Sequence, residues 1–334
     1  MNVSRNVTLL PNSQFDDILC GVITIVVAAV CVAVNGVAAI LVRRSPALRG
    51  SAFSKLTLSM GMADCSTLAL FAVWVGPTAI LQSELAEGSL GKWIGRFMVS
   101  FWFASLFSML AISINRTMAV AMPIHYNRVF SDRNTNVCIG VCWLLSFKCL
   151  LIISPEGCSM YFRVNKYQIG FEDTACGLAM HVYLELYYSM GLILASFACN
   201  MAALVRLKRG NKVALSGLPQ TARLEANRRR RSEVRLFAQS LANAALLAVS
   251  LLTFHGVSSL LFQRASDDQP APSTSRFLKW RTYALTVLVW QAALASNGVL
   301  LWVFVPDLRR AVLRILQGKA SSSDDSQSQV QQRR

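Results

Sequence analysis

Four polar residues stand inside long apolar stretches of the sequence: Asn35, Asp64, Ser105 and Asn297. Their carboxylate, amide and hydroxyl oxygens can accept hydrogen bonds from one another or coordinate a hard cation. A charged group in hydrocarbon costs several kcal/mol, so polar residues at such depth are candidates for function. The sequence therefore predicts a shared polar core, which either forms a hydrogen-bonded network or holds a sodium ion.

A second candidate lies at the end of the third apolar stretch, where Asn115 and Arg116 are followed by Pro123 and Tyr126. An arginine at this depth can extend its guanidinium to the lipid headgroups, which is a purely structural role. Together with Asn35, Asp64, Trp143 and Asn297, however, it belongs to a more specific pattern.

Seven apolar stretches must position these residues. The 334-residue chain is 54% hydrophobic and 15% charged, and each stretch reaches the roughly 20 residues that cross a membrane as a helix. They are too long and too uniformly apolar for the alternating strands of a membrane barrel. The predicted fold is an all-α membrane protein whose seven-helix bundle covers residues 18–305. The predicted spans are about 18–42, 56–81, 93–122, 136–154, 178–205, 235–262 and 281–305.

Basic residues set the predicted orientation. The loop after the first span holds four of them (Arg43, Arg44, Arg49 and Lys55), and the segment before the sixth holds ten, from Arg206 to Arg235. Cytoplasmic loops carry the excess of Lys and Arg, so these segments are expected inside. Residues 1–17 then form an extracellular tail, in which Asn2 and Asn6 are predicted glycosylation sites.

The chain end has two predicted parts. Residues 306–317 have an apolar face flanked by arginines, which favours an amphipathic helix on anionic inner-leaflet lipids. Residues 318–334 are predicted to be a disordered cytoplasmic tail. The net charge of +16 sits mostly in short segments between apolar runs, which favours a membrane surface as its partner and not nucleic acid.

Two of the nine cysteines, Cys158 and Cys176, fall outside the apolar stretches. Both lie in the second outer loop, and the outside is oxidising, so we expect a disulfide between them that holds the loop as a lid. The histidines are scattered, so no metal site is predicted. Nor does the sequence hold a phosphate-binding loop, a nucleophile elbow or paired catalytic carboxylates. It therefore predicts neither an enzyme nor a cofactor.

The polar pattern resembles the rhodopsin-like (family 1) G-protein-coupled receptors. It comprises Asn35 in the first helix, Asp64 in the second, Arg116 closing the third, Trp143 in the fourth and Asn297 in the seventh. The resemblance implies a rhodopsin-like bundle in the plasma membrane. It also implies a small-molecule ligand in the outer half and a heterotrimeric G protein at the inner face.

The sequence departs from that pattern at several positions. Asn115 replaces the usual acid, the helix-seven motif continues from Asn297 as Gly298-Val299-Leu300-Leu301 without Pro or Tyr, and Gly91 replaces the outer cysteine of the third helix. The sixth helix lacks Trp-x-Pro. These departures put the coupling to a G protein in question, and Asn115 is expected to loosen the inactive state.

A narrower resemblance rests on Ser113-Ile114-Asn115-Arg116, Met122-Pro123-Ile124-His125-Tyr126 and Cys158-Ser159-Met160-Tyr161. These segments are similar to the nematode serpentine chemoreceptors of class x, over roughly residues 20–310. The resemblance implies a chemosensory receptor in the plasma membrane of sensory cells.

Alignment on Arg116 places Met98 and Trp102 in the outer half of the bundle. Met98 occupies the position where amine receptors have an acid, and Gln291 the position where opsins have the retinal lysine. Neither a biogenic amine nor retinal is therefore expected as ligand.

Glu185 and Tyr188 lie near the outer end of the fifth helix. Glu185 is either a polar anchor for the ligand or a headgroup-facing residue. The expected pocket is apolar and aromatic, which suits a small organic or lipid-derived molecule.

The predicted function is that of a G-protein-coupled chemosensory receptor. One alternative is a secondary transporter or channel, although the sequence lacks the repeated halves of many transporters. Another is a serpentine receptor that has lost G-protein coupling.

Overall fold

The computed structural model describes residues 11–44, 50–214, 220–264 and 272–304. The predicted glycosylation sites Asn2 and Asn6 lie outside the described residues. So do the predicted amphipathic helix 306–317 and the tail 318–334.

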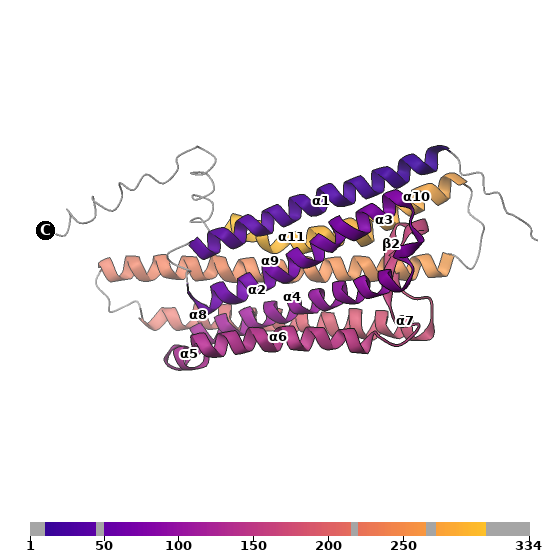
Figure 1. Ribbon diagram of the computed structural model, residues 1–334. Helices are drawn as coiled ribbons and strands as arrows, with labels where there is room; N and C mark the ends of the chain where they lie inside the picture. Colours follow the sequence, from indigo (N-terminus) through magenta and orange to yellow (C-terminus); the bar gives the residue numbers. More distant parts are fainter. Residues whose placement is uncertain (1–10, 45–49, 215–219, 265–271, 305–334) are drawn as a thin grey trace, which may run out of the picture.

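The described chain is almost entirely helical, with one β-hairpin (Figure 1). In chain order, the elements are α1 (Pro11–Arg44), α2 (Ala52–Leu70), η1 (Phe71–Val75), α3 (Gly76–Leu81), η2 (Glu84–Ala86), α4 (Ser89–Ala121), α5 (Pro123–Val129), α6 (Asp132–Ile152), β1 (Met160–Arg163), η3 (Val164–Lys166), β2 (Gln168–Phe171), α7 (Ala175–Ala179), η4 (Met180–Tyr188), α8 (Ser189–Ala214), α9 (Gln220–Arg264), α10 (Pro272–Tyr283), η5 (Ala284–Leu288) and α11 (Val289–Phe304).

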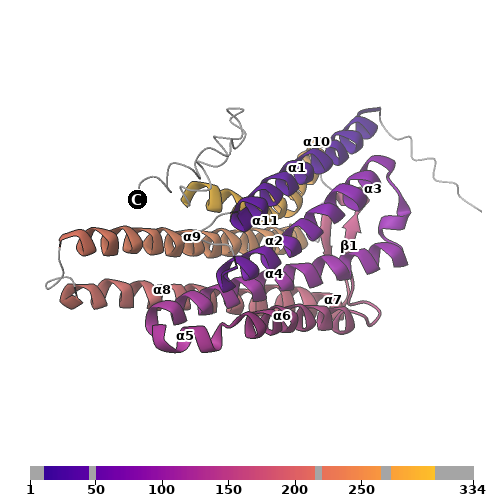
Figure 2. The same ribbon diagram turned by 60° about the vertical axis from the view of Figure 1, so that its left-hand side comes forward.

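Seven helices in the described chain are long and apolar enough to cross a membrane, which confirms the predicted seven-helix bundle. They are Gln14–Arg44, Ala52–Leu81, Ser89–Ala121, Asp132–Ile152, Ala175–Leu207, Val234–Gly256 and Arg276–Phe304. The first helix begins at Pro11, so it includes the end of the segment predicted as a tail. The helices run side by side as one elongated bundle (Figures 1 and 2).

The third span, α4, is the most buried of the seven and packs against α2, α6 and α8. Its buried face carries nineteen residues, among them Ser105, Asn115 and Arg116. A helix buried on nearly all sides has neighbours in every direction. It can therefore carry polar residues that hydrogen-bond to several other helices.

Three of the spans contain a π-helical segment: η1 in the second, η4 in the fifth and η5 in the seventh. Pro77 lies two residues after η1 and has no N–H to donate, so the regular helical ladder is interrupted there. Such wide turns rotate the residues that follow them around the helix axis, and they are frequent at functional sites. Here η4 carries Glu185, and η5 ends two residues before Trp290.

The β-hairpin covers the outer end of the bundle. Its strands pair antiparallel, with Met160 opposite Phe171 and Arg163 opposite Gln168. Gly95 of α4 lies directly under the first strand, because a Cβ atom added there would overlap the carbonyl of Met160. The hairpin and the third span therefore touch backbone to backbone.

The sixth span is part of a much longer helix. α9 has 45 residues, about 68 Å at the usual rise, and begins at Gln220 instead of near the predicted residue 235. Together with the end of α8, it extends past the rest of the bundle at the end where α5 lies (Figures 1 and 2). Much of the segment predicted as a basic loop is thus helical, since arginine and alanine favour helix.

The contact between Gly95 and Met160 predicts that Gly95→Ala lowers the thermal stability of the purified receptor. The added methyl group must displace backbone, and overpacking of this kind costs about 1–3 kcal/mol. The matched control is Gly140→Ala, because a Cβ at Gly140 meets nothing within 4 Å. An equal melting temperature for Gly95→Ala and Gly140→Ala would contradict the close packing of the hairpin on α4.

Candidate functional site

The polar residues of the predicted core are all buried. The hydroxyl of Ser105 donates a hydrogen bond to the carboxylate of Asp64, which links the third span to the second. The other carboxylate oxygen, Oδ2, is buried and has no hydrogen-bond partner among the described residues. Asp64 therefore lies inside the bundle with one acceptor still available.

Asn35 and Asn297 make different contacts. Nδ2 of Asn35 donates to the carbonyl of Leu294 at 3.0 Å, and Oδ1 of Asn297 accepts from Nε2 of Gln239 at 3.5 Å. The four residues thus make three separate contacts, which join the first span to the seventh, the second to the third and the sixth to the seventh.

Gly298 explains part of the unusual helix-seven motif. A Cβ atom at this position would overlap Oδ1 of Asn35 and lie 3.2 Å from its Cα. Because glycine has no side chain, the first and seventh spans can approach each other closely at this position. The close approach that requires glycine at 298 is incompatible with a proline ring.

At the inner end, Arg116 points into the bundle and is 5% exposed. Its guanidinium donates to the carbonyl of Leu236 and, at 3.1 Å, to the hydroxyl of Ser240, both on α9. It also lies 4.2 Å from the ring centre of Phe53 on α2. Arg116 therefore fastens the third span to the sixth and does not reach out to the headgroups.

The neighbouring Asn115 has a separate partner, because its Nδ2 donates to the hydroxyl of Tyr126 at 3.2 Å. Tyr126 lies on the short helix α5, so Asn115 holds this helix against the end of α4. A cavity of about 290 Å³, which includes space open to solvent, lies above the arginine. Its lining residues come from α2, α4, α9 and α11: Phe53, Thr57, Met60, Met109, Ile112, Arg116, Gln239, Ser240, Asn243 and Asn297.

A second cavity, of about 320 Å³ including open space, lies in the outer half of the bundle. It is lined by Trp102, Glu185, Ser250, Leu251, Phe254, Leu285, Thr286 and Trp290. The ring of Trp290 meets those of Trp102 and Phe254 edge to face, at centroid distances of 6.1 and 6.4 Å. The cavity is thus mostly apolar and aromatic, with one carboxylate.

Of the five pocket residues that the sequence suggests, Trp102 and Glu185 line this cavity. Met98 is buried in the core, Tyr188 packs its ring against Phe103, and Nε2 of Gln291 donates to the carbonyl of Thr24 at 3.4 Å. None of these three is among the described lining residues. Tyr188 is the last residue of the π-helical segment η4, and Gln291 lies three residues after η5. The extra residue that such a segment inserts into a helix could not be read from the sequence.

Trp290 and Phe254 are among the lining residues that sequence reasoning missed, although both stand in apolar runs of the sequence. It also missed that Glu185 lies beside two histidines. Nδ1 of His181 is 3.0 Å from the Glu185 carboxylate, and Nε2 of His255 is 3.9 Å from it. The four-residue spacing of His181 and Glu185 was a readable signal, whereas the approach of His255 on another helix was not.

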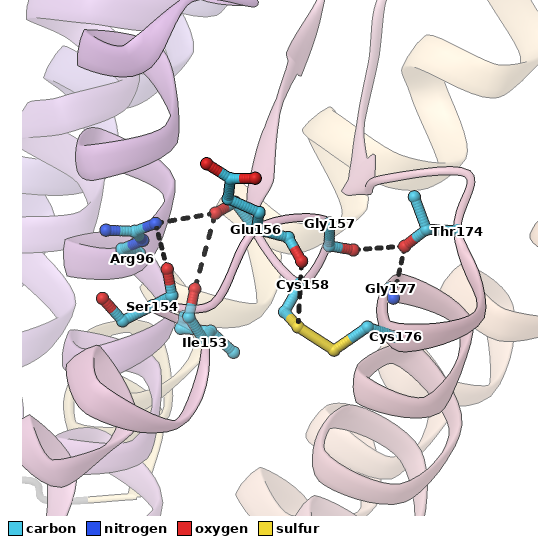
Figure 3. The surroundings of a disulfide bond; sticks show 10 residues. Arg96, Ile153, Ser154, Glu156, Gly157, Cys158, Thr174, Cys176 and Gly177 are labelled. Atoms are coloured by element: carbon cyan, nitrogen blue, oxygen red, sulfur yellow. Dashed lines mark hydrogen bonds between the residues drawn. A yellow bond between two sulfur atoms is a disulfide. The ribbon is translucent and has the colours of Figure 1, made fainter.

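The outer loop contains the predicted disulfide between Cys158 and Cys176, which is confirmed (Figure 3). Thr174 caps the helix that carries Cys176, since its hydroxyl accepts from the N–H of Gly177 at 3.0 Å. The same hydroxyl donates to the carbonyl of Gly157, next to Cys158. The disulfide and the Thr174 hydrogen bonds therefore tie the start of the outer loop to the start of the fifth span.

Polar contacts, not a second disulfide, join this loop to the third span. Arg96 donates to the carbonyl of Ser154 at 2.9 Å and to the hydroxyl of Ser159 at 3.0 Å. Lys92 forms a 2.7 Å salt bridge with Glu172. These contacts lie one turn from Gly91, where the rhodopsin-like pattern has a cysteine, and they hold the loop without it.

The turn of the hairpin reaches the first span. The hydroxyl of Tyr167 donates to Asp17, and burial together with this carboxylate raises the pKa of Tyr167 well above its usual value. The phenol therefore stays protonated and remains a donor. The adjacent Asp16 accepts two hydrogen bonds from Arg276 on α10, at 2.6 and 2.7 Å. The outer ends of the first span, the hairpin and the seventh span are thus fastened together.

The described seven-helix membrane bundle has the rhodopsin-like fold of the seven-transmembrane receptors. The profile of the family described as "Serpentine type 7TM GPCR chemoreceptor Srx" matches residues 25–304. The chain belongs to this family, and it is a multi-pass protein of the plasma membrane.

Individual proteins agree with this assignment. Serpentine receptor class X 45 of Caenorhabditis elegans is 23% identical over 288 residues, which are 84% of this chain and 77% of the relative. Adenosine receptor A3 of Ovis aries is 30% identical over 131 residues, which are only 36% of this chain and 38% of that receptor. The crystal structure of squid rhodopsin superposes with a TM-score of 0.71 at 15% identity, over 94% of this chain and 91% of rhodopsin.

The disulfide closes a loop across a separation of 18 positions, so its removal is expected to lower stability by about 3 kcal/mol. Thermal melting of Cys158→Ser and Cys176→Ser checks this, and the double variant should melt no lower than the single ones, because both lose the same bond. Cys199→Ala removes an unpaired thiol and serves as control. Wild-type melting temperatures in the disulfide variants would show that the bond contributes no stability.

Proposed function

We propose that this receptor binds a small organic or lipid-derived molecule in the outer cavity and signals to a heterotrimeric G protein at its inner end. The observation that carries the proposal is the double role of α9. This helix supplies Leu251 and Phe254 to the outer cavity and also supplies Leu236 and Ser240 to the hydrogen bonds of Arg116. A ligand that shifts α9 at the outer cavity would therefore also act on the hydrogen bonds between α9 and Arg116.

The composition of α9 supports this mechanical link. Fourteen positions separate Ser240 from Phe254, about 21 Å along the helix axis. The helix contains no proline from Gln220 to Arg264, and proline is the commonest cause of a sharp helix kink. Because the Trp-x-Pro motif is missing, the sixth span has no proline kink and can transmit a shift along its whole length. The missing motif does not by itself indicate lost coupling.

The lining of the outer cavity limits the ligand chemistry. Trp102, Phe254 and Trp290 favour a compact apolar or aromatic molecule, and Glu185 offers one charged or hydrogen-bonding contact. Phe171 of the hairpin lines the adjoining cavity beside Trp102 and Glu185, which fits the role of the outer loop as a lid. The chemosensory family to which the chain belongs supports a ligand of external origin.

Activation would break the hydrogen bonds between Arg116 and α9. A ligand with higher affinity for the open arrangement shifts the population towards it. The opening would expose Arg116, Asn115 and the inner cavity to the G protein. The basic residues between Arg206 and Arg235 carry positive charge that would favour anionic inner-leaflet lipids.

The polar core would act as the hinge between the two arrangements. Asp64 and Ser105 join the second and third spans, and Asn297 meets Gln239 on the moving sixth span. The partnerless oxygen of Asp64 supports a role for this residue beyond packing. A sodium ion at Asp64 is a proposal of the same kind, and binding of the ion would favour the closed arrangement.

The principal alternative is a transporter or channel. The chemoreceptor family to which the chain belongs supports a receptor, and the fold shared with squid rhodopsin agrees with it. The same findings support a role that is not enzymatic.

The test combines a screen with a coupling assay. Cells that express the receptor are screened against small organic and lipid molecules with a calcium or cAMP readout, and the active molecule is then used in nucleotide exchange with purified receptor and G protein. We expect Trp290→Leu to raise the half-maximal concentration at least tenfold, because it removes the central ring of the cavity. Arg116→Ala should abolish exchange while the ligand still binds.

Trp93→Leu is the matched control, since Trp93 is exposed and lies outside the cavity. Unchanged exchange in Arg116→Ala would contradict the inner site, and an unchanged concentration dependence in Trp290→Leu would contradict the outer one. Ligand-dependent flux through proteoliposomes without nucleotide exchange would show a transporter instead.

A further inference from the structure

Three potential metal ligands meet at the outer end of the fifth and sixth spans. The donor atoms of His181, Glu185 and His255 all lie within 4.8 Å of one another. Two come from the π-helical segment η4, and the third comes from α9. From these contacts, we propose that the three side chains bind a divalent transition-metal ion of the zinc class.

The distances are close to those of a bound ion. Tetrahedral zinc with Zn–N and Zn–O bonds of about 2.0–2.2 Å keeps its ligand atoms roughly 3.4 Å apart. The observed separations are 3.0 Å from His181 to Glu185 and 3.9 Å from His255 to Glu185. The donor atoms of the two histidines lie within 4.8 Å of each other. Rotation of the side chains, which unstacks the two imidazole rings, would therefore bring all three donors to one centre.

The environment of His255 also points to a missing partner. Its Nε2 atom is buried and has no hydrogen-bond partner among the described residues. The ring stacks on that of His181 at a centroid distance of 4.1 Å, and Phe254 contacts both rings. A buried imidazole nitrogen without a partner is costly, and a metal ion would satisfy it.

Charge gives a further argument. The carboxylate of Glu185 is buried at 14% side-chain exposure, and its ion-pair contacts among the described residues are only with the two histidines. A divalent ion would neutralise this carboxylate and leave both imidazoles in the neutral, metal-binding form. Two histidines and one glutamate form a known zinc ligand set, in which a fourth position stays open. Imidazole nitrogen and a single carboxylate suit zinc and copper better than magnesium or calcium.

The position of the ion would give it a regulatory effect. Glu185 lines both outer cavities, so an ion held there is next to the proposed ligand position. It would also connect the fifth span to α9, the helix that reaches Arg116. Bound zinc would therefore oppose a separation of these two helices at their outer ends.

Zinc binding is measured on purified, tag-free, full-length receptor in nanodiscs, by competition with a chromophoric zinc chelator. We expect one zinc ion per receptor, and at least tenfold weaker binding in His181→Ala, Glu185→Gln and His255→Ala. His255→Cys should retain binding, because a thiolate also ligates zinc. His125→Ala is the control, since His125 lies exposed on α5.

The melting temperature gives an independent readout, because an ion that binds the folded state raises it. Micromolar zinc should raise the melting temperature of the wild type and of His125→Ala but not of His255→Ala, and magnesium should raise none. Equal zinc affinity in wild type and His255→Ala, or no zinc-dependent shift in the wild type, would overturn the proposal. Neither assay contains ligand or G protein, so its outcome does not depend on the proposed function.

Discussion

Inside the hydrocarbon, a buried polar side chain must find its hydrogen-bond partner within the protein, because lipid cannot supply one. Some hydroxyls bond to a carbonyl of their own helix, as Ser100 does with Arg96 at 2.9 Å, whereas other side chains bond to a neighbouring helix. This constraint organises the bundle. Asn200 donates to Ser113 at 2.8 Å, Trp143 to Ser59 at 3.0 Å and Ser296 to Asn243 at 2.7 Å. Each bond joins two different spans, so the polar residues fix which helices are neighbours while apolar packing supplies most of the contact area.

The two ends of the receptor are held together by different kinds of contact. The outer end is fastened by several independent contacts: the disulfide, the Arg96 hydrogen bonds and the bidentate pair of Arg276 with Asp16. At the inner end, Arg116 joins the third span to the sixth through a few hydrogen bonds. The outer end is thus held by a covalent bond and ion pairs, whereas the described contacts between the third and sixth spans at the inner end are noncovalent, which suits the proposed rearrangement there.

Much of the fold and part of the site could be predicted from the sequence. Span lengths gave the seven helices, and the location of Cys158 and Cys176 in one outer loop gave the disulfide, because both depend on local pattern and membrane side. The partners of Tyr188 and Gln291 could not be predicted, since π-helical segments rotate these residues away from the positions that regular helices imply. The proximity of His255 to Glu185 depends on how two distant helices pack, which no local pattern records.

The central claim is that the hydrogen bonds of Arg116 hold α9 against α4 at the inner end. It is tested most directly by electron–electron double resonance between nitroxide labels at Ala119 and Arg235, in a background with the seven free cysteines replaced. Ser240→Ala removes one of these bonds and should shift the distance distribution towards longer separations, while Thr253→Ala, higher on the same helix, should leave it unchanged. An identical distribution in wild type and Ser240→Ala, together with an unchanged one in Arg116→Ala, would contradict the account.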